Sequence, residues 1–363
     1  MKITIFILII LLFFLIINQE NKKIEHFLSY KKCDKYKISD NLKLFLDNYN
    51  INKSFSNDSG LWIPCGYRTA ENQLIKLIPN NENQLIFAIP GHDQLAGKNY
   101  LFDIIRNYYG IKMASNIIPM TYLLNNKNDM INFKNNFDKN ELYILKKNIQ
   151  NKKGLLITNN LSEILNAYKD NFKIVQIFLK DVYRINKRKL NFRIYLLIIC
   201  EPNKKLKFYV SKLGKILYTN KNYNNNDRDW QQNITSHNLD PVIYDQNPQD
   251  LRDFENFIGK NKYISFFNQI INLINLTMKA VSFKICNLEN IKNNTSFQLF
   301  GLDFIANKKL SLKLLEINKG PSMIPVNRKD EIMKNKITSD IFELLNLIKY
   351  NNNKMNDFIL INK

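Results

Sequence analysis

Two carboxylates and one amide lie in a part of the sequence that is otherwise apolar. Residues 297–323 read FQLFGLDFIANKKLSLKLLEINKGPSM, and Asp303, Glu316 and Asn318 interrupt the apolar runs. Because side chains alternate faces along a strand, Glu316 and Asn318 should point the same way. Hard cations such as Mg²⁺ prefer oxygen ligands, typically one or two carboxylates together with substrate phosphates. The stretch is therefore a candidate magnesium site.

A hairpin would bring these side chains together. The runs LFGLDFIA and LSLKLLEIN are strand-like and are joined across the polar NKK. Pairing around that turn predicts that Asp303 lies roughly opposite Glu316. The same pattern also fits an edge strand whose wet face carries the polar residues without a metal. The residues alone leave both interpretations open.

The rest of the chain predicts mixed secondary structure around this hairpin. Apolar segments of strand length include QLIFAIP, ELYILKK, GLLITNN, FKIVQIFL, NFRIYLLIIC and LKFYV. Helical spacing appears in YLFDIIRNYYG, ISFFNQIINLINLTMKAV and ITSDIFELLNLIKY. Asparagine-rich interruptions such as NNEN, NNKND and NYNNNDRD are expected to be loops. Since no regular βαβ rhythm occurs, the predicted fold class is α+β or mixed α/β.

The composition restricts the partners. The chain has 363 residues, a net charge of +21 and 45% hydrophobic residues, which excludes a disordered chain. A basic surface attracts nucleic acid, anionic lipid or an acidic protein segment, although an AT-rich genome would also enrich lysine. No nucleic-acid-binding module is visible, so no specific nucleic-acid partner is predicted. The common phosphate-loop, zincin and serine-hydrolase motifs are missing as well.

Four blocks of the sequence resemble the tubulin tyrosine ligase and ligase-like family. FQLFGLDF … LLEINKGPS is similar to the family pattern F-E-L-F-G-x-D-F … L-L-E-V-N-x-x-P-S. IVQIFLKDVYRINKRKLNFRIYLLI, ELYILKKNIQNKKGLLI and FAIPGHDQLAGKNYLFDII … IIPMTYLL resemble three further blocks in the family's order. The resemblance extends from about residue 87 to about residue 322.

The resemblance implies an ATP-grasp-type fold, in which α+β lobes hold ATP and Mg²⁺ between them. It implies a ligase that joins a carboxylate to an amine through an acyl phosphate. Such enzymes add tyrosine, glutamate or glycine to a protein target, typically a tubulin tail. The expected partners are thus an acidic protein or peptide and an amino acid. Two alternatives remain, an inactive membrane-tethered ATP-grasp binding module and an ATP-grasp ligase of a small molecule.

The resemblance also assigns roles to individual residues. Asp303, Glu316 and Asn318 would hold Mg²⁺, and Lys189 and Arg193 would be catalytic. Lys146 and Arg193 each interrupt an apolar strand-like run, where an unpaired charge would be costly. The alignment leaves the choice between Lys146 and Lys147 open, and a buried core glutamine is the alternative for Gln176. The residues expected to bind ATP are Lys98, Lys146, Gln176, Leu179, Lys189, Arg193 and Asp303.

Three positions depart from the family pattern. Asn191 stands where the pattern K-F-D-I-R has aspartate, and Ser236 replaces an asparagine of a weakly matched H-L-T-N block. After Gly214 no arginine follows at the family's G-x-x-R position, and Tyr218 is nearby. These losses lie on the ATP and acceptor side, which keeps a nucleotide-binding pseudoenzyme among the alternatives.

An apolar segment at residues 3–17 predicts an N-terminal membrane anchor. No small-residue cleavage pattern follows it, and lysines are more numerous after it than before it. Positive flanks stay cytosolic, so a single-pass membrane protein with a cytosolic catalytic domain is expected. Cys33, Cys65, Cys200 and Cys286 are far apart in sequence and are expected to be unpaired, as in a reducing compartment. The predicted domains are residues 1–20 (anchor), 21–94 (N-terminal domain), 95–180 (central ATP-grasp lobe) and 181–350 (C-terminal lobe with the Mg-binding hairpin).

Overall fold

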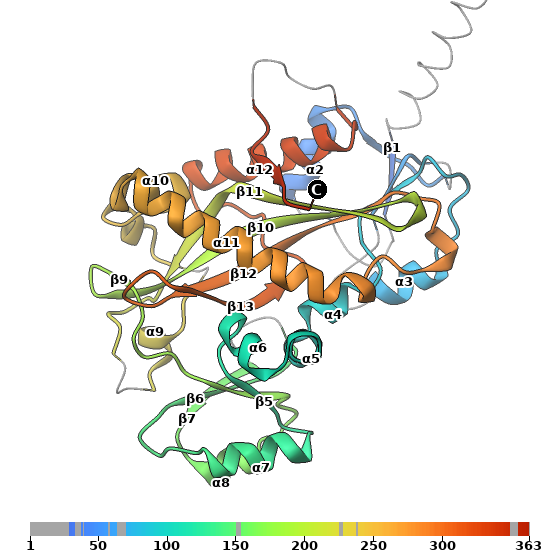
Figure 1. The fold of residues 1–363 in the computed structure, drawn as a ribbon. Helices are drawn as coiled ribbons and strands as arrows, with labels where there is room; N and C mark the ends of the chain where they lie inside the picture. The colour runs from blue at the N-terminus through green and yellow to red at the C-terminus, as the bar shows by residue number, and fades with distance from the viewer. Residues whose placement is uncertain are drawn as a thin grey trace, which may run out of the picture.

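The computed structural model describes residues 29–32, 38, 40–56, 59–63, 70–149, 154–224, 228–236, 239–348 and 355–362. These residues form a ten-stranded sheet and a separate four-stranded sheet, together with helices that cover them (Figure 1). The fold class predicted from the sequence, a mixture of strands and helices, is confirmed.

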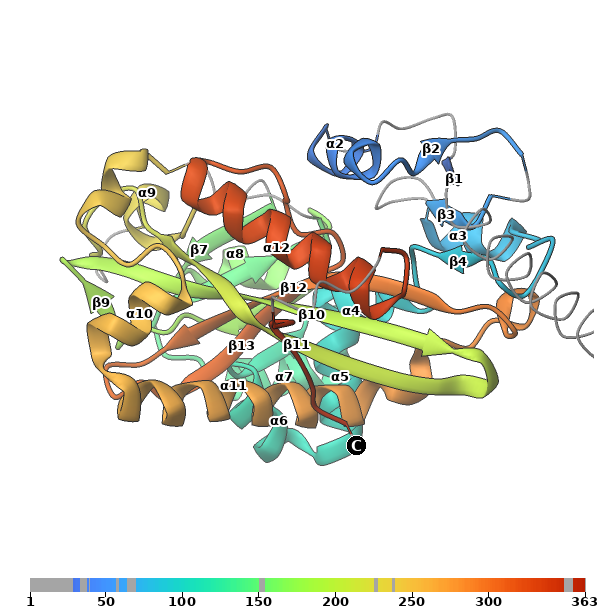
Figure 2. The same cartoon turned by 90° about the horizontal axis from the view of Figure 1, so that it is seen from above.

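The centre of the large sheet consists of three long antiparallel strands. β10 (Arg188–Glu201) pairs with β11 (Lys205–Tyr218) on one side and with β12 (Ser296–Ala306) on the other. The strands are apolar along most of their length because helices cover both faces. Figure 2 shows α11 (Lys260–Val281) on one side of these strands and α12 (Arg328–Leu344) on the other.

The alternation of side chains along β10 explains how one strand serves two cores. Ile194, Leu196 and Ile198 belong to the apolar cluster that contains α11 residues such as Ile270. Tyr195, Leu197 and Ile199 point the opposite way, into a second cluster that contains Ile337 and Ile341 of α12. The strand is buried on both sides, so a charge on it must find a partner inside the protein.

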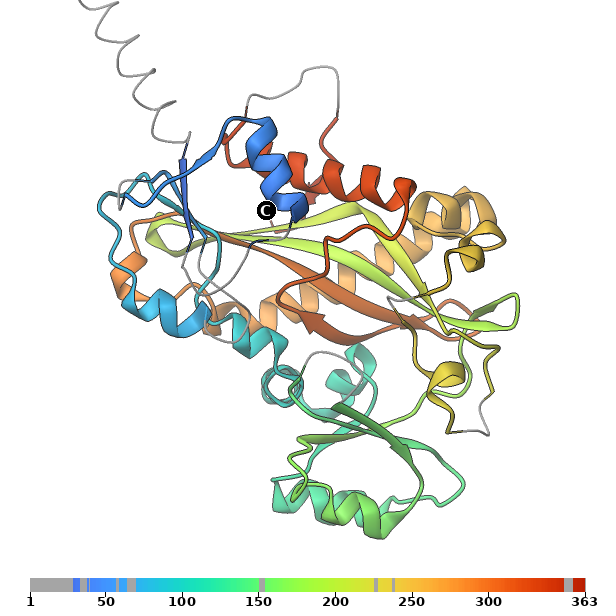
Figure 3. The same ribbon diagram turned by 180° about the vertical axis from the view of Figure 1, so that it is seen from behind.

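Short strands extend the large sheet at both ends. β4 (Leu85–Ile86), β3 (Leu61–Ile63), β1 (Ser29–Lys32) and β2 (Asn52–Lys53) follow β12 in that order, and β14 (Phe358–Leu360) pairs with β11. α2 (Asp40–Asn48) lies beside α12 (Figure 3), where the rings of Phe45 and Phe342 are 5.0 Å apart. Strands from the first ninety residues thus continue the sheet that carries β12.

The small sheet has the order β5 (Thr121–Leu123), β8 (Ile174–Ile177), β6 (Tyr143–Lys146) and β7 (Leu155–Thr158). α7 (Lys127–Asn135) and α8 (Leu161–Asn166) cover its outer face. The NNKND stretch, expected to be a loop, instead begins α7. Asn126 caps this helix by accepting hydrogen bonds from the backbone N–H groups of Asn128 and Asp129.

The remaining elements connect the two sheets. α5 (Lys98–Tyr109) and α6 (Ile111–Ile117) lie between the sheets in Figure 1. β13 (Leu312–Asn318) pairs with β12, and β9 (Arg184–Ile185) pairs with the start of β10. The short helices are α3 (Ala70–Lys76), α4 (His92–Ala96), α9 (Trp230–Asn233) and α10 (Leu251–Ile258). The domain boundaries at 20, 94 and 180 stay predictions.

The membrane localisation predicted from the sequence needs correction. Among the residues that the structure describes, no helix is both long enough and apolar enough to cross a bilayer. The segment at 3–17 that suggested an anchor lies outside the described residues. The single-pass localisation is therefore not retained.

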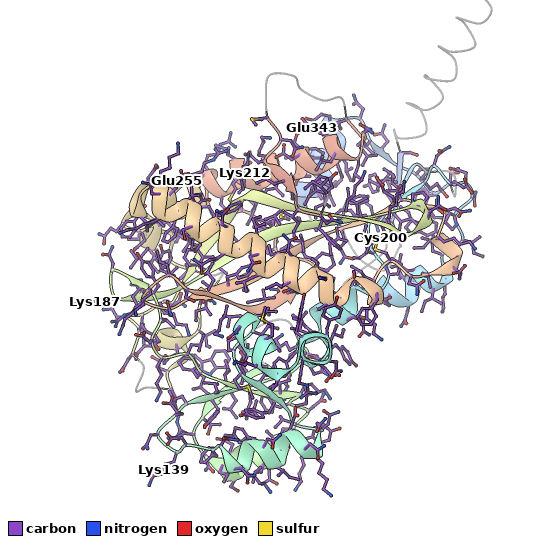
Figure 4. The ribbon with its side chains drawn as sticks, in the orientation of Figure 1. Lys139, Lys187, Cys200, Lys212, Glu255 and Glu343 are labelled. Atoms are coloured by element: carbon purple, nitrogen blue, oxygen red, sulfur yellow. A yellow bond between two sulfur atoms is a disulfide. The ribbon has the colours of Figure 1, made fainter. Side chains whose placement is uncertain are left out.

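The expectation of unpaired cysteines is wrong for two of the four. Cys200 at the end of β10 and Cys286, in the connection between α11 and β12, form a disulfide with Cα atoms 5.7 Å apart (Figure 4). They are 86 residues apart in sequence, so only the tertiary fold brings them together. Cys33 and Cys65 lie outside the described residues. Cysteine usage consequently no longer argues for a reducing compartment.

Candidate nucleotide and metal site

A cavity of about 600 Å³ lies between the two sheets. Ile144, Lys146 and Gln176 of the small sheet line one side, and residues of β10, β12 and β13 line the other. A volume of this size suits a nucleotide-sized ligand. All nine residues predicted for the site line this cavity, namely Lys98, Lys146, Gln176, Leu179, Lys189, Arg193, Asp303, Glu316 and Asn318.

The predicted hairpin and its pairing are confirmed. β12 and β13 are antiparallel, and Asp303 is the direct partner of Glu316. The amide nitrogen of Asn318 lies 3.4 Å from carboxylate oxygens of both residues. Asp303 is only 6% exposed, so the acidic residue is not on a wet strand face. Three oxygen-bearing side chains therefore converge on one wall of the cavity.

Arg193 balances the charge of Asp303 from the neighbouring strand. The two residues are direct partners in the β10–β12 ladder, and the guanidinium donates Nε to Oδ1 and Nη2 to Oδ2, the latter at 2.8 Å. Gly301 makes this possible, because a Cβ there would lie 2.9 Å from Cδ of Arg193. Burial lowers the pKa of Arg193, but the Asp303 charge outweighs it and raises that pKa.

Glu316 has cations of its own. Lys98, the first residue of α5, places Nζ 3.3 Å from Oε2 of Glu316. Burial would raise the pKa of Glu316, yet the charges of Lys98, Lys146 and Arg193 lower it to about 2. The pKa of Asp303 is raised, by burial and by the Glu316 charge, although Arg193 opposes this. A divalent cation beside the two carboxylates would favour their ionised forms.

Lys146 and Lys189 also line the cavity, and their charges are less well neutralised than that of Arg193. Burial lowers the pKa of Lys146 to about 8, and burial together with the nearby Lys146 lowers that of Lys189 to about 7. Lys189 places Nζ 4.3 Å from the centre of the Phe178 ring. Lys147, the alternative to Lys146, does not line the cavity and lies over the Phe172 ring instead. Buried ammonium groups of this kind suit an anionic ligand.

Gln176 and Leu179 occupy the part of the cavity next to the small sheet. Gln176 donates Nε2 to Oγ1 of Thr121 at 2.8 Å and approaches the carbonyl of Pro119 at 3.4 Å. Gln176 is therefore a hydrogen-bonded core residue that also reaches the cavity wall. The interpretation as a buried core glutamine is confirmed, and a contact with adenine stays a prediction.

The donor set fits a divalent cation held at the hairpin. Two carboxylates and an amide meet there, and the surrounding cations are what phosphate oxygens require.

A second acidic group, Glu71 and Asp93 around the buried His92, is arranged differently. Glu71 lies 3.3 Å from Nδ1 and Asp93 lies 3.7 Å from Nε2. Carboxylates at different ring nitrogens suit contacts to the imidazole better than a shared metal ion.

A family model described as "Tubulin-tyrosine ligase family" matches residues 76–357 of this sequence. The chain belongs to the tubulin-tyrosine ligase family. The match includes the small sheet, the strands β10 to β13 of the large sheet and every residue predicted for the site.

Several curated members of the tubulin-tyrosine ligase family are similar to this chain. A probable beta-tubulin polyglutamylase of Tetrahymena thermophila is 25% identical over 294 residues, 72% of this chain and 24% of the relative. The probable tubulin polyglutamylase ttll-9 of Caenorhabditis elegans is 24% identical over 203 residues, 52% of this chain and 47% of the relative. Tubulin glycylase 3C of Tetrahymena is 25% identical over 213 residues, 53% of this chain and 19% of the relative. The chain thus spans between a fifth and a half of these relatives.

Two of the three departures from the pattern of the tubulin-tyrosine ligase family lie at the cavity wall. Asn191 and Ser236 line it, and the amide of Asn191 donates to Oγ1 of Thr235 at 3.0 Å. Tyr218 points away and donates its hydroxyl to the carbonyl of Pro248 at 2.9 Å. Its neighbour Leu217 is the residue at the cavity wall, which sequence reasoning missed. Adjacent residues of β11 face opposite sides of the sheet, so Leu217 and Tyr218 cannot both face the cavity. This alternation could have directed attention to Leu217.

Replacing Lys189 by methionine should stabilise the ligand-free protein in a pH-dependent way. The folded-state pKa of Lys189 is about 7, below the ordinary value of 10.5, so the unfolded chain binds more protons between these values. The stability of the wild type should rise with pH in that window, by at most about 1.4 kcal/mol per unit. The advantage of Lys189→Met should therefore be largest at pH 7 and below.

Urea unfolding of both proteins between pH 6 and 10 measures this effect. Lys187→Met is the matched control, because Lys187 does not line the cavity. A constant difference between Lys189→Met and wild type across the range would contradict the depressed pKa.

Proposed function

We propose that this chain is an ATP-dependent carboxylate–amine ligase that attaches an amino acid to an acidic protein segment, with a tubulin tail as the first candidate. The observation that supports this most is the convergence of Asp303, Glu316 and Asn318 on one cavity wall beside several buried cations. Relatives named as tubulin polyglutamylases and a tubulin glycylase support glutamate and glycine as the first amino acids to test, with tyrosine third.

The proposed reaction has two steps. The γ-phosphoryl group of ATP is transferred to a carboxylate oxygen, which yields an acyl phosphate and ADP. The amine nitrogen then attacks the acyl carbon, an amide bond forms, and inorganic phosphate leaves with the C–O bond electrons while the amine loses a proton. Mg²⁺, when bound, supplies positive charge that offsets the charge developing on the phosphate oxygens.

The residues of this chain have distinct parts in the proposed reaction. Asp303, Glu316 and Asn318 would hold the metal ion at the hairpin. Lys189 and Arg193 would contact the transferred phosphoryl group, because fixed cations stabilise charge that grows on its oxygens. The two sheets on either side of the cavity would keep water from the acyl phosphate.

Further groups would hold the nucleotide. Lys98 and Lys146 line the cavity and would neutralise the ATP phosphates. Gln176 and the backbone near Leu179 would meet the adenine edge, because an apolar lining with a few polar groups suits a base.

A labelled-amino-acid assay tests the proposal directly. The protein is incubated with Mg-ATP, tubulin or host lysate, and a panel of radiolabelled amino acids that includes glutamate, glycine and tyrosine. We expect incorporation into protein for one of them, dependent on both ATP and Mg²⁺. Incorporation that persists without ATP, or none with any amino acid while Mg-ATP binds, would reject the ligase assignment.

A second candidate, a nucleotide-binding protein without ligase activity, has one observation in its favour. Leu217, Asn191 and Ser236 make one end of the cavity neutral where the family pattern carries charge or an amide. Mg-ATP binding without amino-acid incorporation would select this candidate. A ligase acting on a small molecule would instead incorporate label into a soluble product.

Binding of an acidic peptide should depend strongly on salt. The chain carries a net charge of +21, and screening shortens the reach of such a field to about 8 Å at physiological ionic strength. We expect a glutamate-rich peptide to bind more weakly as NaCl rises from low to physiological concentration. Fluorescence anisotropy measures this, with a scrambled peptide of equal charge and a duplex DNA as comparisons. Tighter binding of the DNA at equal salt would oppose a protein substrate.

A further inference from the structure

The row of charged residues at the site continues onto a fourth strand. Lys215 of β11 is the direct partner of Arg193 on β10, so the two side chains lie on the same face of the sheet. Arg193 is paired in turn with Asp303. The Lys215 side chain is only 4% exposed and does not line the cavity. A buried ammonium beside Arg193 needs an acidic partner of its own.

That partner is Asp330, in the first turn of α12. Lys215 donates Nζ to Oδ2 of Asp330 at 2.8 Å, and Lys334 of the same helix donates to this oxygen at 2.8 Å as well. The Asp330 side chain is fully buried. Burial alone would raise the pKa of Asp330, but the charges of the two lysines lower it, so the carboxylate is ionised at neutral pH. Lys215, Asp330 and Lys334 thus form a buried ionic cluster, the α12 cluster.

The α12 cluster binds the backbone of the segment that leads from β13 to α12. Asp330 accepts a hydrogen bond from the backbone N–H of Val326 at 2.9 Å, and Lys334 donates Nζ to the backbone carbonyl of Ile324 at 2.6 Å. Ile324 is 65% exposed and Val326 is 36% exposed, so the packing of these two side chains holds the segment only weakly. Hydrogen bonds to charged, buried groups are stronger anchors for this part of the chain.

The beginning of the same segment forms part of the cavity wall. Gly320, Pro321 and Ser322 line the cavity. Pro321 also lies close to Arg193, because a Cβ built on Gly301 would be 2.9 Å from Cβ of Pro321 and 2.9 Å from Cδ of Arg193. A displacement of this segment would therefore move the wall of the cavity next to Arg193.

We propose that Lys215 is a positioning residue for the nucleotide site, which acts through Asp330 to hold residues 320–326 against Arg193. The inference rests on the proposed function for its account of what the cavity binds. Lys215 is the member of the α12 cluster that belongs to the sheet, whereas Asp330 and Lys334 belong to α12. Without Lys215, the cluster would tie the segment to the helix alone and no longer to the strand beside Arg193.

The first measurement examines the anchoring itself in nucleotide-free protein. Lys215→Met keeps the length of the side chain and removes its charge, while Asp330 keeps Lys334 as a partner. Hydrogen exchange followed by mass spectrometry reports the backbone amides of residues 320–328. We expect them to exchange about fivefold faster in Lys215→Met, the effect of weakening one buried hydrogen bond. Unchanged exchange would show that Lys215 does not hold the segment.

The second measurement examines positioning. At saturating Mg²⁺, the ATP concentration that gives half-maximal thermal stabilisation should rise about fivefold in Lys215→Met, because a displaced wall loses ligand contacts equivalent to about one hydrogen bond. Lys334→Met weakens the α12 cluster from the helix side and should show both effects, so it decides the question if Lys215→Met does not fold. Faster exchange with an unchanged ATP midpoint would reduce Lys215 to a purely structural residue and overturn the proposal.

Lys336 offers a matched control on the same helix. It pairs with Asp340, a buried carboxylate of α12 that accepts a hydrogen bond from the backbone N–H of Asp357 at 3.0 Å, and neither residue of the pair lines the cavity. Lys336→Met should leave both the exchange of residues 320–328 and the ATP midpoint as in wild type. If wild-type protein shows no Mg²⁺-dependent ATP binding, the proposed function fails, and the exchange data decide the anchoring by Lys215 independently.

Discussion

Replacing Glu316 by glutamine should abolish the stabilisation that Mg-ATP gives to the protein. At a ligand concentration one hundred times the dissociation constant, the wild type should gain about 2.7 kcal/mol. The variant should gain almost nothing, because glutamine keeps the volume of Glu316 but removes the charge shared by Lys98 and a divalent cation. Amino-acid ligation should fall about a hundredfold or more. Thermal unfolding with and without Mg-ATP measures the first effect.

Glu331→Gln supplies the control for charge removal. Glu331 lies on α12 and pairs with Arg328 at 2.8 Å on a more exposed surface. This variant should respond to Mg-ATP as the wild type does. Full Mg-ATP stabilisation of Glu316→Gln would show that the hairpin carboxylates do not bind metal, and would leave them as an ordinary ion-paired strand.

Replacing Arg193 by methionine should destabilise the protein by about 3–5 kcal/mol, since it leaves Asp303 as a buried charge without its partner. Burial then raises the pKa of Asp303 further above its unfolded value. A carboxyl group with a raised folded-state pKa loses its contribution to stability as pH rises through that pKa. The deficit of the variant should therefore be smallest at acid pH and grow toward pH 7, as measured by urea unfolding.

The double variant Arg193→Met/Asp303→Asn tests whether this loss belongs to the pair. Because the double variant has no buried carboxylate without a partner, most of the lost stability should return. A double variant as unstable as Arg193→Met alone would mean that the packing of the arginine stem, rather than the ion pair, stabilises the β10–β12 contact. Neither variant should bind Mg-ATP with wild-type affinity.

The cavity could be predicted to the extent that its residues lie on long, regular strands. Asp303 and Glu316 face each other because an antiparallel pair joined by a short polar turn has little freedom in its register. Lys146 and Arg193 were identifiable because each interrupts an apolar run. Such a run indicates a buried strand, and a charge there needs a partner. The family resemblance then supplied the roles of these residues, which alternation of polar and apolar residues cannot supply.

Other features depend on contacts between distant segments and left no local signal. The strands β1 to β4 are two to four residues long, too short for an alternating pattern to be recognised. Cys200 and Cys286 meet only because the connection after α11 returns to the end of β10.

The ladder of Arg193, Asp303 and Glu316 across β10, β12 and β13 has a consequence for how the protein folds. Arg193 and Asp303 are 110 residues apart in sequence, so the site can form only after slow, long-range strand pairing is complete. A chain emerging from the ribosome would lack the metal-binding wall until β13 has been synthesised and paired. Mg-ATP binding should thus appear as one of the last events of refolding, and its onset would time the closure of the central sheet.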